Sequence, residues 1–339
     1  MTRRGLRSPT VIAVAALVVA VAAVGIWAAA GGPRRPDGGG RQAAAGSPVV
    51  ASVSLDDNPR QVVLAADGLW ALGERALYRI DPAGNRVVAT IPLGTVVAAP
   101  AALALAGGAA WVPAGASSTL WRVDRATGRV DGRIGLDRRL LGPVGVAAQD
   151  GTVWVSCCAL QHGPRPAGVL LRVDTRRNRV VARIPIADGP LAVTAGAGAV
   201  WVATARGGVL RVDPESNRVV GRVPLAAGSR VEAIAATPRG IWAVDTGDYH
   251  VLRLDPGSGR VGLAVAAPLP RGVGVGDGGA WVIVTNDRTL ARVDERDGRL
   301  GARVPADVVR DVRGIAVGAG ALWVTTGNQV LRLDPRRLP

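Results

Sequence analysis

Residues 191–225 read LAVTAGAGAVWVATARGGVLRVDPESNRVVGRVPL, and this stretch contains four short apolar runs separated by turn residues. The runs are Leu191–Ala195, Ala199–Thr204, Val209–Asp213 and Arg218–Leu225. Gly, Pro, Asn and Asp stand between them, which is typical of short β-strands joined by tight turns. The stretch is therefore predicted to form one four-stranded antiparallel meander.

The same unit recurs seven times along the chain. A tryptophan stands in the second run of each unit, at spacings of 39 to 47 residues: Trp70, Trp111, Trp154, Trp201, Trp242, Trp281 and Trp323. The third run of each unit ends in Arg, an aliphatic residue and Asp, the last being Asp81, Asp124, Asp174, Asp213, Asp255, Asp294 and Asp334. Four strands in roughly 40 residues are the signature of a propeller blade. The sequence predicts an all-β fold, a seven-bladed β-propeller over residues 49–339 with four-stranded antiparallel blades.

The two ends of the repeat region complement each other. The seventh unit stops at Asp334-Pro335 without a fourth strand, and Val49–Leu55 precedes the first unit without three strands of its own. We expect residues 49–55 to supply the outer strand of the last blade, which closes the ring and leaves no open sheet edge between its ends.

The N-terminal region has a different composition. Residues 1–9 are basic, residues 10–30 are apolar, and residues 31–48 are rich in Gly, Pro, Ala and Arg. Twenty uncharged residues in a helix span about 30 Å, the thickness of a bilayer core. The region reads either as a single transmembrane anchor with a cytoplasmic N-terminus or as a cleaved signal peptide, followed by a flexible linker. Both alternatives place the propeller outside the cytoplasm, at the cell membrane or secreted.

The chain has 339 residues and a formal charge of +15, and every basic side chain is Arg. Thirteen arginines recur at fixed positions of the repeat: Arg79, Arg122, Arg172, Arg211, Arg253, Arg292 and Arg332 on the third strands, and Arg86, Arg129, Arg179, Arg218, Arg260 and Arg299 at the start of the fourth. We interpret these as structural positions, and the tryptophans as packing between blades. We therefore expect no nucleic-acid partner.

Two stretches carry a family resemblance. Asn85-Arg86-Val87-Val88-Ala89-Thr90-Ile91-Pro92-Leu93-Gly94 resembles the outer strand of the YVTN-type bacterial β-propeller repeat, and Trp323-Val324-Thr325-Thr326-Gly327-Asn328 resembles its inner strand. Gly314-Ile315-Ala316-Val317, followed by Leu322-Trp323, is distantly similar to the repeats of the virginiamycin B lyases. The first resemblance implies a seven-bladed propeller. The second implies a metal-dependent lyase with catalytic His and Glu, although the chain has only two His and departs from the lyase pattern after each Trp.

One row of residues breaks the symmetry of the repeats. The position ten residues before each Trp is predicted to start the innermost strand, on the face that carries the blade-to-blade connections, here called the top face. Around the ring this row reads Arg60, Ala101, Val144, Leu191, Glu232, Arg271 and Arg313. If blades six, seven and one are neighbours, their three arginines form a basic arc at the channel mouth, suited to carboxylate or phosphate. The alternative is a set of solvated rim charges.

Two top-face loops carry reactive side chains. Cys157 and Cys158 are adjacent in an insertion that also contains His162; a vicinal disulfide or a metal site are the alternatives, and the disulfide is favoured in an oxidising compartment. Asp245-Thr246-Gly247-Asp248-Tyr249-His250 is either a polar turn, with Tyr249 and His250 packed at its base, or a group in which Asp, Tyr and His together do acid–base work.

The sequence favours a binding module over an enzyme. Residues Arg60, Arg271, Arg313, Glu232 and His250 are the candidate ligand contacts, with no complete catalytic set and no cofactor or metal expected. The expected partner is an envelope protein or an anionic small molecule, bound by a monomeric, membrane-tethered propeller. A metal-dependent lyase of the virginiamycin B type is the alternative.

Overall fold

The computed structural model describes residues 41–42, 47–94, 97, 102–114, 118–136, 140–159, 168–206, 208–276, 279–285, 288–294, 297–305, 308–309 and 311–338. The chain divides after residue 35 into two units, and all described residues belong to the second. The apolar segment 10–30 lies outside the described residues, so anchor and signal peptide both remain predictions. Among the described residues, no helix has the length and apolar character needed to cross a bilayer.

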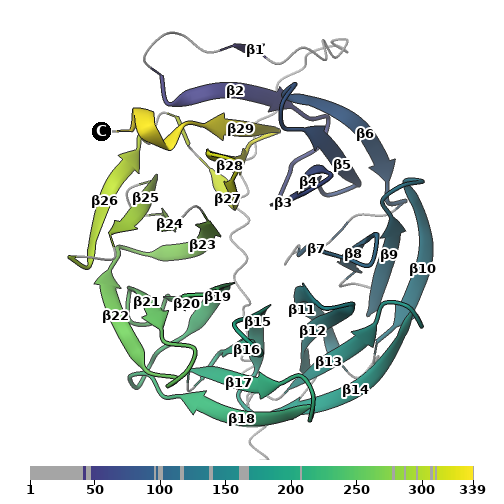
Figure 1. Cartoon of the computed structure of the whole chain (residues 1–339), viewed down its shortest axis with the longest axis vertical. Helices are drawn as coiled ribbons and strands as arrows, with labels where there is room; N and C mark the ends of the chain where they lie inside the picture. Colours follow the sequence, from purple (N-terminus) through teal and green to yellow (C-terminus); the bar gives the residue numbers. More distant parts are fainter. Residues whose placement is uncertain are drawn as a thin grey trace, which may run out of the picture. The chain divides into compact units, whose positions relative to one another are not determined.

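Seven antiparallel sheets stand around a common centre, as the repeats predict (Figure 1). Blades one to three comprise β3 (Gln61–Ala65), β4 (Gly68–Leu72), β5 (Ala76–Asp81) and β6 (Arg86–Pro92); β7 (Ala104–Ala106), β8 (Ala109–Ala114), β9 (Thr119–Asp124) and β10 (Arg129–Gly135); and β11 (Leu140–Gln149), β12 (Thr152–Ala159), β13 (Gly168–Asp174) and β14 (Arg179–Ile186). In each of these sheets sequential strands are neighbours.

The remaining blades repeat the pattern. Blades four to six comprise β15 (Pro190–Gly196), β16 (Ala199–Thr204), β17 (Val209–Asp213) and β18 (Arg218–Val223); β19 (Val231–Thr237), β20 (Gly240–Asp245), β21 (His250–Leu254) and β22 (Val261–Ala266); and β23 (Pro270–Gly276), β24 (Gly279–Val284), β25 (Thr289–Asp294) and β26 (Arg299–Val304). Blade seven has β27 (Val312–Gly318), β28 (Ala321–Thr326) and β29 (Gln329–Leu333), followed by a short 3-10 turn, η2 (Pro335–Arg337).

The N-terminal strand closes the ring. β2 (Val49–Ser54) pairs antiparallel with β29, with Ser52 opposite Leu331 and Val53 opposite Val330. The backbone N–H of Leu55 donates to the carbonyl of Asn328 at 2.8 Å, so the pairing extends to the predicted end of the strand. β2 lies outside β29 at the circumference (Figure 1). The predicted closure is confirmed, and β1 (Arg41–Gln42), two residues of the expected linker, pairs with the outer side of β2.

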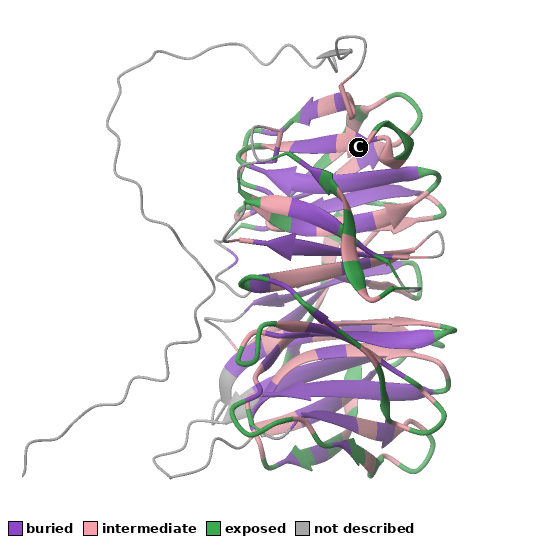
Figure 2. Ribbon diagram, turned by 90° about the vertical axis from the view of Figure 1, so that its left-hand side faces the viewer, coloured by how far each residue is buried: buried purple, intermediate pink, exposed green. Residues whose placement is uncertain are grey.

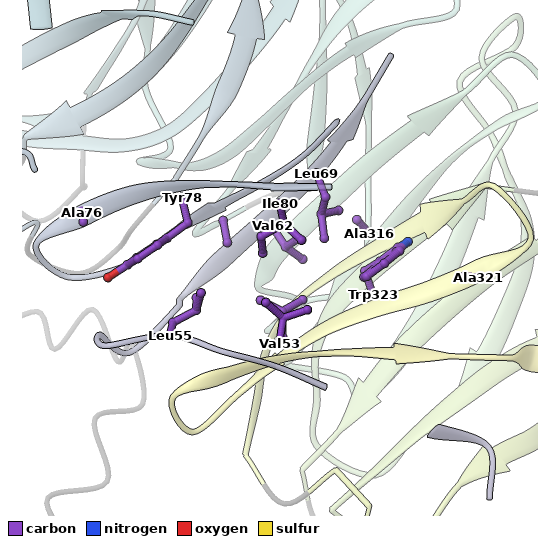
Figure 3. Packing of buried hydrophobic residues seen from close by; sticks show 12 residues of the cluster. Val53, Leu55, Val62, Leu69, Ala76, Tyr78, Ile80, Ala316, Ala321 and Trp323 are labelled. Carbon is purple, nitrogen blue, oxygen red and sulfur yellow. The ribbon is translucent and has the colours of Figure 1, made fainter. Parts of the chain in front are cut away.

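The tryptophans pack between blades, as expected from their size. Trp323 of blade seven lies in one cluster with Val62 and Ile80 of blade one and Val53 of β2 (Figure 3). Trp70 of blade one packs in turn against blade two. All seven are at most 4% exposed. Burial is greatest on the second and third strands and least at the outer edges (Figure 2), so the core is a set of seven interfaces between sheets.

Four of the third-strand arginines, Arg79, Arg172, Arg211 and Arg332, stack on the tryptophan of their own blade. Arg172 lies directly opposite Trp154 in the β12–β13 pairing, with its guanidinium 5.4 Å from the ring centroid. Its Nη1 donates to the carbonyl of Pro214, at 2.7 Å, and to Asn217 Oδ1, at 3.1 Å, both in the β17–β18 turn of the next blade. Arg332 stacks on Trp323 in the same way, and its Nη1 donates to the carbonyl of Pro82, where blade seven meets blade one. These contacts link a blade to its neighbour.

The turn between the third and fourth strands has one repeated chemistry. Its first residue is the motif aspartate, whose carboxylate accepts backbone N–H bonds inside the turn, as predicted; Asp174 Oδ1 accepts from Arg176 and Arg177, both at 2.9 Å. The residue that ends this turn, one position before the fourth strand or two positions before it in blade five, has a positive φ and is Asn or Gly: Asn85, Gly128, Asn178, Asn217, Gly259 and Gly298.

Candidate binding site at the channel mouth

The predicted row of charged residues lies at the ends of the innermost strands. Arg60 immediately precedes β3, Arg271 is the second residue of β23, and Arg313 is the second residue of β27. The innermost strands face the centre of the ring (Figure 1). A Cβ added to Gly314 of β27 would lie 3.1 Å from the carbonyl oxygen of Arg60 and 3.0 Å from the Cα of Gln61. Blades seven and one are therefore direct neighbours at this end.

Each of the three arginines contacts a different carboxylate. Arg60 Nη2 donates to Glu74 Oε1 at 2.6 Å, and Arg313 donates through Nε and Nη2 to Asp311 Oδ2, at 3.1 and 2.5 Å. Arg271 Nη1 lies 3.4 Å from Glu232 Oε2. The side chains of Arg60, Arg271 and Arg313 are 24%, 31% and 31% exposed. The arc is thus a row of half-buried ion pairs rather than three open cations.

Glu232 joins two blades. Its Oε1 accepts from Arg230 Nε at 2.7 Å, and its Oε2 faces Arg271 of blade six. Two of the predicted ligand contacts, Glu232 and Arg271, are therefore brought into contact with each other. Counting Arg60, Arg230, Arg271 and Arg313 against Glu74, Glu232 and Asp311 gives four positive and three negative charges, a formal sum of +1.

Two aspartates hold the blade-one side of the mouth by hydrogen bonds. Tyr78 Oη donates to Asp56 Oδ1 at 2.6 Å, and Asp57 Oδ2 accepts the backbone N–H of Arg75 at 2.6 Å. Burial, and then the hydrogen bond to Asp56, raises the pKa of Tyr78 above its usual value, so this hydroxyl stays protonated and donating. These contacts hold the β4–β5 loop that carries Glu74.

His250 lies apart from this row, on the third strand of blade five. Its Nδ1 is 2.6 Å from the carbonyl of Asp248 in its own turn and 3.5 Å from the Asp248 carboxylate. Asp245, 2% exposed, accepts the backbone N–H groups of Arg230, Gly247 and Asp248. The Asp245 carboxylate therefore stabilises the turn, as the polar-turn alternative for this loop expects.

The cysteine loop is described only in part. Cys157 is buried in β12, whereas the side chain of Cys158 and residues 160–167 lie outside the described residues. The predicted disulfide between Cys157 and Cys158 therefore stays a prediction. In the part of the chain that the structure describes, no three His, Cys, Asp or Glu side chains gather as metal ligands would.

Three residues of the channel mouth were not predicted from the sequence: Glu74, Arg230 and Asp311. Each lies outside the single repeat position that was compared between blades. Arg230 and Asp311 precede Glu232 and Arg313 by two residues. In a strand such residues share a face, so that spacing was the available signal. Glu74 comes from a loop, and only the folded blade brings it to Arg60.

Comparisons with known proteins identify the fold and no family. No family model matches the chain, and no curated protein matches it in sequence. Among solved structures, a chain of Kuenenia stuttgartiensis hydrazine synthase aligns with a TM-score of 0.68 at 15% identity, over 83% of this chain and 97% of that chain. The computationally designed Ika8 protein aligns at 0.61 and 10% identity, over 83% of this chain and 98% of its own.

A third solved structure is the Pan2 WD40 domain of Neurospora crassa, with a TM-score of 0.61 and 12% identity over 82% of this chain and 90% of that domain. An enzyme chain, a designed protein and a WD40 domain thus share this architecture. Propellers carry unrelated activities, and identities this low establish the fold alone. The chain is a seven-bladed β-propeller with four antiparallel strands in each blade.

Proposed function

We propose that this chain is an extracytoplasmic, membrane-tethered binding propeller whose channel mouth on blades six, seven and one takes an anionic ligand. The observation that carries the proposal is the placement of Arg271, Arg313 and Arg60 at the same point of three adjacent innermost strands. Guanidinium groups placed in this way can bind carboxylate or phosphate groups through paired hydrogen bonds. Such groups occur on small molecules and on acidic segments of envelope proteins.

The ion pairs at the mouth leave hydrogen-bond donors for a ligand. A guanidinium has five N–H donors, and Glu74 occupies one donor of Arg60. A ligand with several oxygens can therefore bind the remaining donors while the internal carboxylates hold the forks in place.

The location of this module rests on the sequence. Residues 10–30 have the length and the basic flank of a membrane anchor or a signal peptide. The resemblance to YVTN-type propellers fits a repeat domain outside the cytoplasm. The lyase alternative gains no specific support, because His250 and Glu232 are each held by different neighbours and lie on the third and first strands of blade five.

A thermal-shift screen of the full-length chain tests the proposal. The probes are inorganic phosphate, di- and tricarboxylates and soluble cell-wall fragments. A ligand at a hundred times its Kd stabilises by about 2.7 kcal/mol, which raises the Tm of a domain of this size by roughly 5 °C. We expect that shift in the wild type and its loss in Arg60→Ala/Arg271→Ala/Arg313→Ala.

The control substitutes three exposed arginines away from the mouth, Arg239→Ala/Arg336→Ala/Arg337→Ala, and should keep the shift. Equal loss in both triple variants would show a general charge effect and contradict the proposed site. If no probe shifts the wild type, a small anionic ligand is excluded for this panel. Pull-down from envelope extracts with the same two variants then tests the protein partner.

A further inference from the structure

The outer surface of the ring carries arginines almost without carboxylates. The fourth strands β6, β10, β14, β18, β22 and β26 form its circumference (Figure 1). They carry nine exposed arginines: Arg86, Arg129, Arg133, Arg179, Arg183, Arg218, Arg222, Arg299 and Arg303. Their one acidic residue is Asp131, which forms an ion pair with Arg122. The other described carboxylates lie in the loops and turns and on the inner strands of the blades.

Three consecutive blades concentrate this charge. β10, β14 and β18 each present two arginines four residues apart, on the outward face: Arg129 and Arg133, Arg179 and Arg183, Arg218 and Arg222. We name this surface the outer wall. Four residues of strand place the two arginines of a blade about 13 Å apart. Two carboxylates lie beside this surface: Asp131, which pairs with Arg122, and Asp188, which is bound to Arg222. Arg133 also stacks on Trp121, with its guanidinium 5.6 Å from the ring centroid.

Protection of sheet edges explains only part of this pattern. Charged side chains on outer strands discourage pairing with other chains, and either sign of charge serves that purpose. Here the charges on the fourth strands of five blades are arginines except for Asp131, and valines such as Val181 and Val220, 41% and 55% exposed, stand beside the arginines. A surface of one sign attracts a partner of the opposite sign over several ångströms. The outer wall therefore has the properties of a docking surface as well as those of a protected edge.

We propose that the outer wall binds a flexible, linear phosphate polymer. Arginine forks bind phosphate in two-point contacts, and a polymer meets several of them in series. The wall follows the circumference of the ring, so a flexible chain can follow it over three blades (Figure 1). A flat membrane would touch a convex surface along one line only. The outer strands contain no aromatic residue on which bases would stack, which favours a polymer without bases.

Binding of end-labelled inorganic polyphosphate to the full-length chain, followed by anisotropy at several salt concentrations, tests this inference. The wall variant is Arg179→Gln/Arg183→Gln/Arg218→Gln/Arg222→Gln. We expect its affinity near physiological salt to fall at least about tenfold, because it removes four phosphate contacts, and the slope of log K against log salt to fall by roughly 3. Thermal unfolding of the variant should stay close to the wild type, since these side chains are exposed.

The matched control removes the same charge elsewhere, with Arg239→Gln/Arg288→Gln/Arg336→Gln/Arg337→Gln, and should keep most of the affinity and slope. Equal losses in both variants would overturn the inference, because net charge alone would then explain binding. The channel-mouth triple variant should also bind polyphosphate normally; a loss there would move the polymer to the channel mouth.

Two further probes distinguish other anionic partners. Single-stranded DNA of the same length should bind no more tightly than polyphosphate, and tighter DNA binding would contradict a polymer without bases. Vesicles containing phosphatidylglycerol should bind weakly and without dependence on the wall arginines. Vesicle binding that is lost in the wall variant, with no polyphosphate binding in the wild type, would assign the wall to a membrane instead.

Discussion

Arg172 and Arg179 belong to the same repeat of blade three and are seven residues apart, yet they have opposite surroundings. Arg172, on the third strand, stacks on Trp154 and donates to the turn of the next blade. Arg179, on the fourth strand, is exposed. The third strand lies between its sheet neighbours and the adjoining blade, whereas the fourth has no protein beyond it. Periodicity therefore identifies a position in the repeat without showing whether its charge is structural or available to a partner.

This difference changes the interpretation of the repeated charge. The sequence grouped thirteen arginines as one structural class. The structure supports that interpretation for third-strand arginines such as Arg79, Arg172 and Arg332, which have tryptophan or backbone partners. It does not support it for the fourth-strand set, described as exposed at Arg86, Arg129, Arg179, Arg218, Arg260 and Arg299. The second set has the exposure that a binding surface requires.

The largest effect is expected where the fourth strand itself is removed. In blade seven that strand is β2, which carries no arginine. Ala51 and Val53 of β2 and the following residue, Leu55, are only 4%, 3% and 5% exposed. Deleting residues 49–55 exposes these contacts and the outer side of β29. Burying a large apolar side chain stabilises a protein by up to about 3 kcal/mol, and the residues of β29 that the deletion uncovers lose burial as well. We therefore expect the free energy of unfolding to fall by more than about 6 kcal/mol.

The melting temperature measures this loss, and deletion of seven linker residues, 32–38, is the control. An unchanged melt in the 49–55 deletion, or equal changes in both, would show that ring closure contributes little. That result would contradict the comparison between third and fourth strands, because the outer strands would then be dispensable for stability, whatever charge they carry.

The second largest effect on stability is expected at Trp154, the residue on whose indole ring Arg172 stacks. Trp154 is 1% exposed and packs against blade four. Trp154→Ala should lower the free energy of unfolding by about 3–5 kcal/mol, because it leaves a cavity between two sheets. Urea denaturation measures it, with Trp154→Phe as the control that keeps most of the apolar volume. A loss below 1 kcal/mol for the alanine variant would mean that the blade interface can collapse around the missing ring.

The direct test compares the two arginines. Arg172→Ala removes a cation–π contact and two hydrogen bonds from a charged donor, so we expect a loss of about 1.5–3 kcal/mol. Arg179→Ala should change the stability by no more than about 0.5 kcal/mol. Both are measured by urea denaturation in the same buffer. Equal effects of the two substitutions would remove the distinction between the third and fourth strands.

The repeat pattern predicted the fold because each of its signals is local. Tryptophan size, the aspartate turn and the unpaired strand 49–55 are readable from neighbouring residues, and the structure confirms all three. The channel mouth was only partly predictable. Arg271 and Glu232 meet across two blades, and Arg60 meets Glu74 through a loop, so their pairing depends on folded distances. The hydrogen bonds of Arg172 and Arg332 to the turn of the adjoining blade likewise depend on a second blade, which one repeat does not contain.

The smallest expected effect comes from the aspartates that link the two classes of strand. At Asp174 and Asp213, hydrogen bonds lower the pKa of the carboxyl group below the usual 3.8; the largest cause is the backbone N–H of Arg177 at Asp174 and the Ser216 hydroxyl at Asp213. The folded chain then binds these protons less readily than the unfolded chain. Their contribution to stability is full above about pH 5 and is lost as the pH falls through 4 toward the lower folded pKa.

Melting curves from pH 7 to 3 test this dependence. Asp174→Asn/Asp213→Asn keeps an oxygen acceptor in each turn but removes the titration, so its melting temperature should decline less steeply below pH 5 than that of the wild type. Asp150→Asn/Glu215→Gln, two exposed side chains outside these roles, should leave the wild-type slope unchanged. If both pairs flatten the curve equally, the acid sensitivity comes from the overall charge. If only the turn pair does, the short turn that separates the partly buried Arg172 from the exposed Arg179 also contributes to the loss of stability in acid.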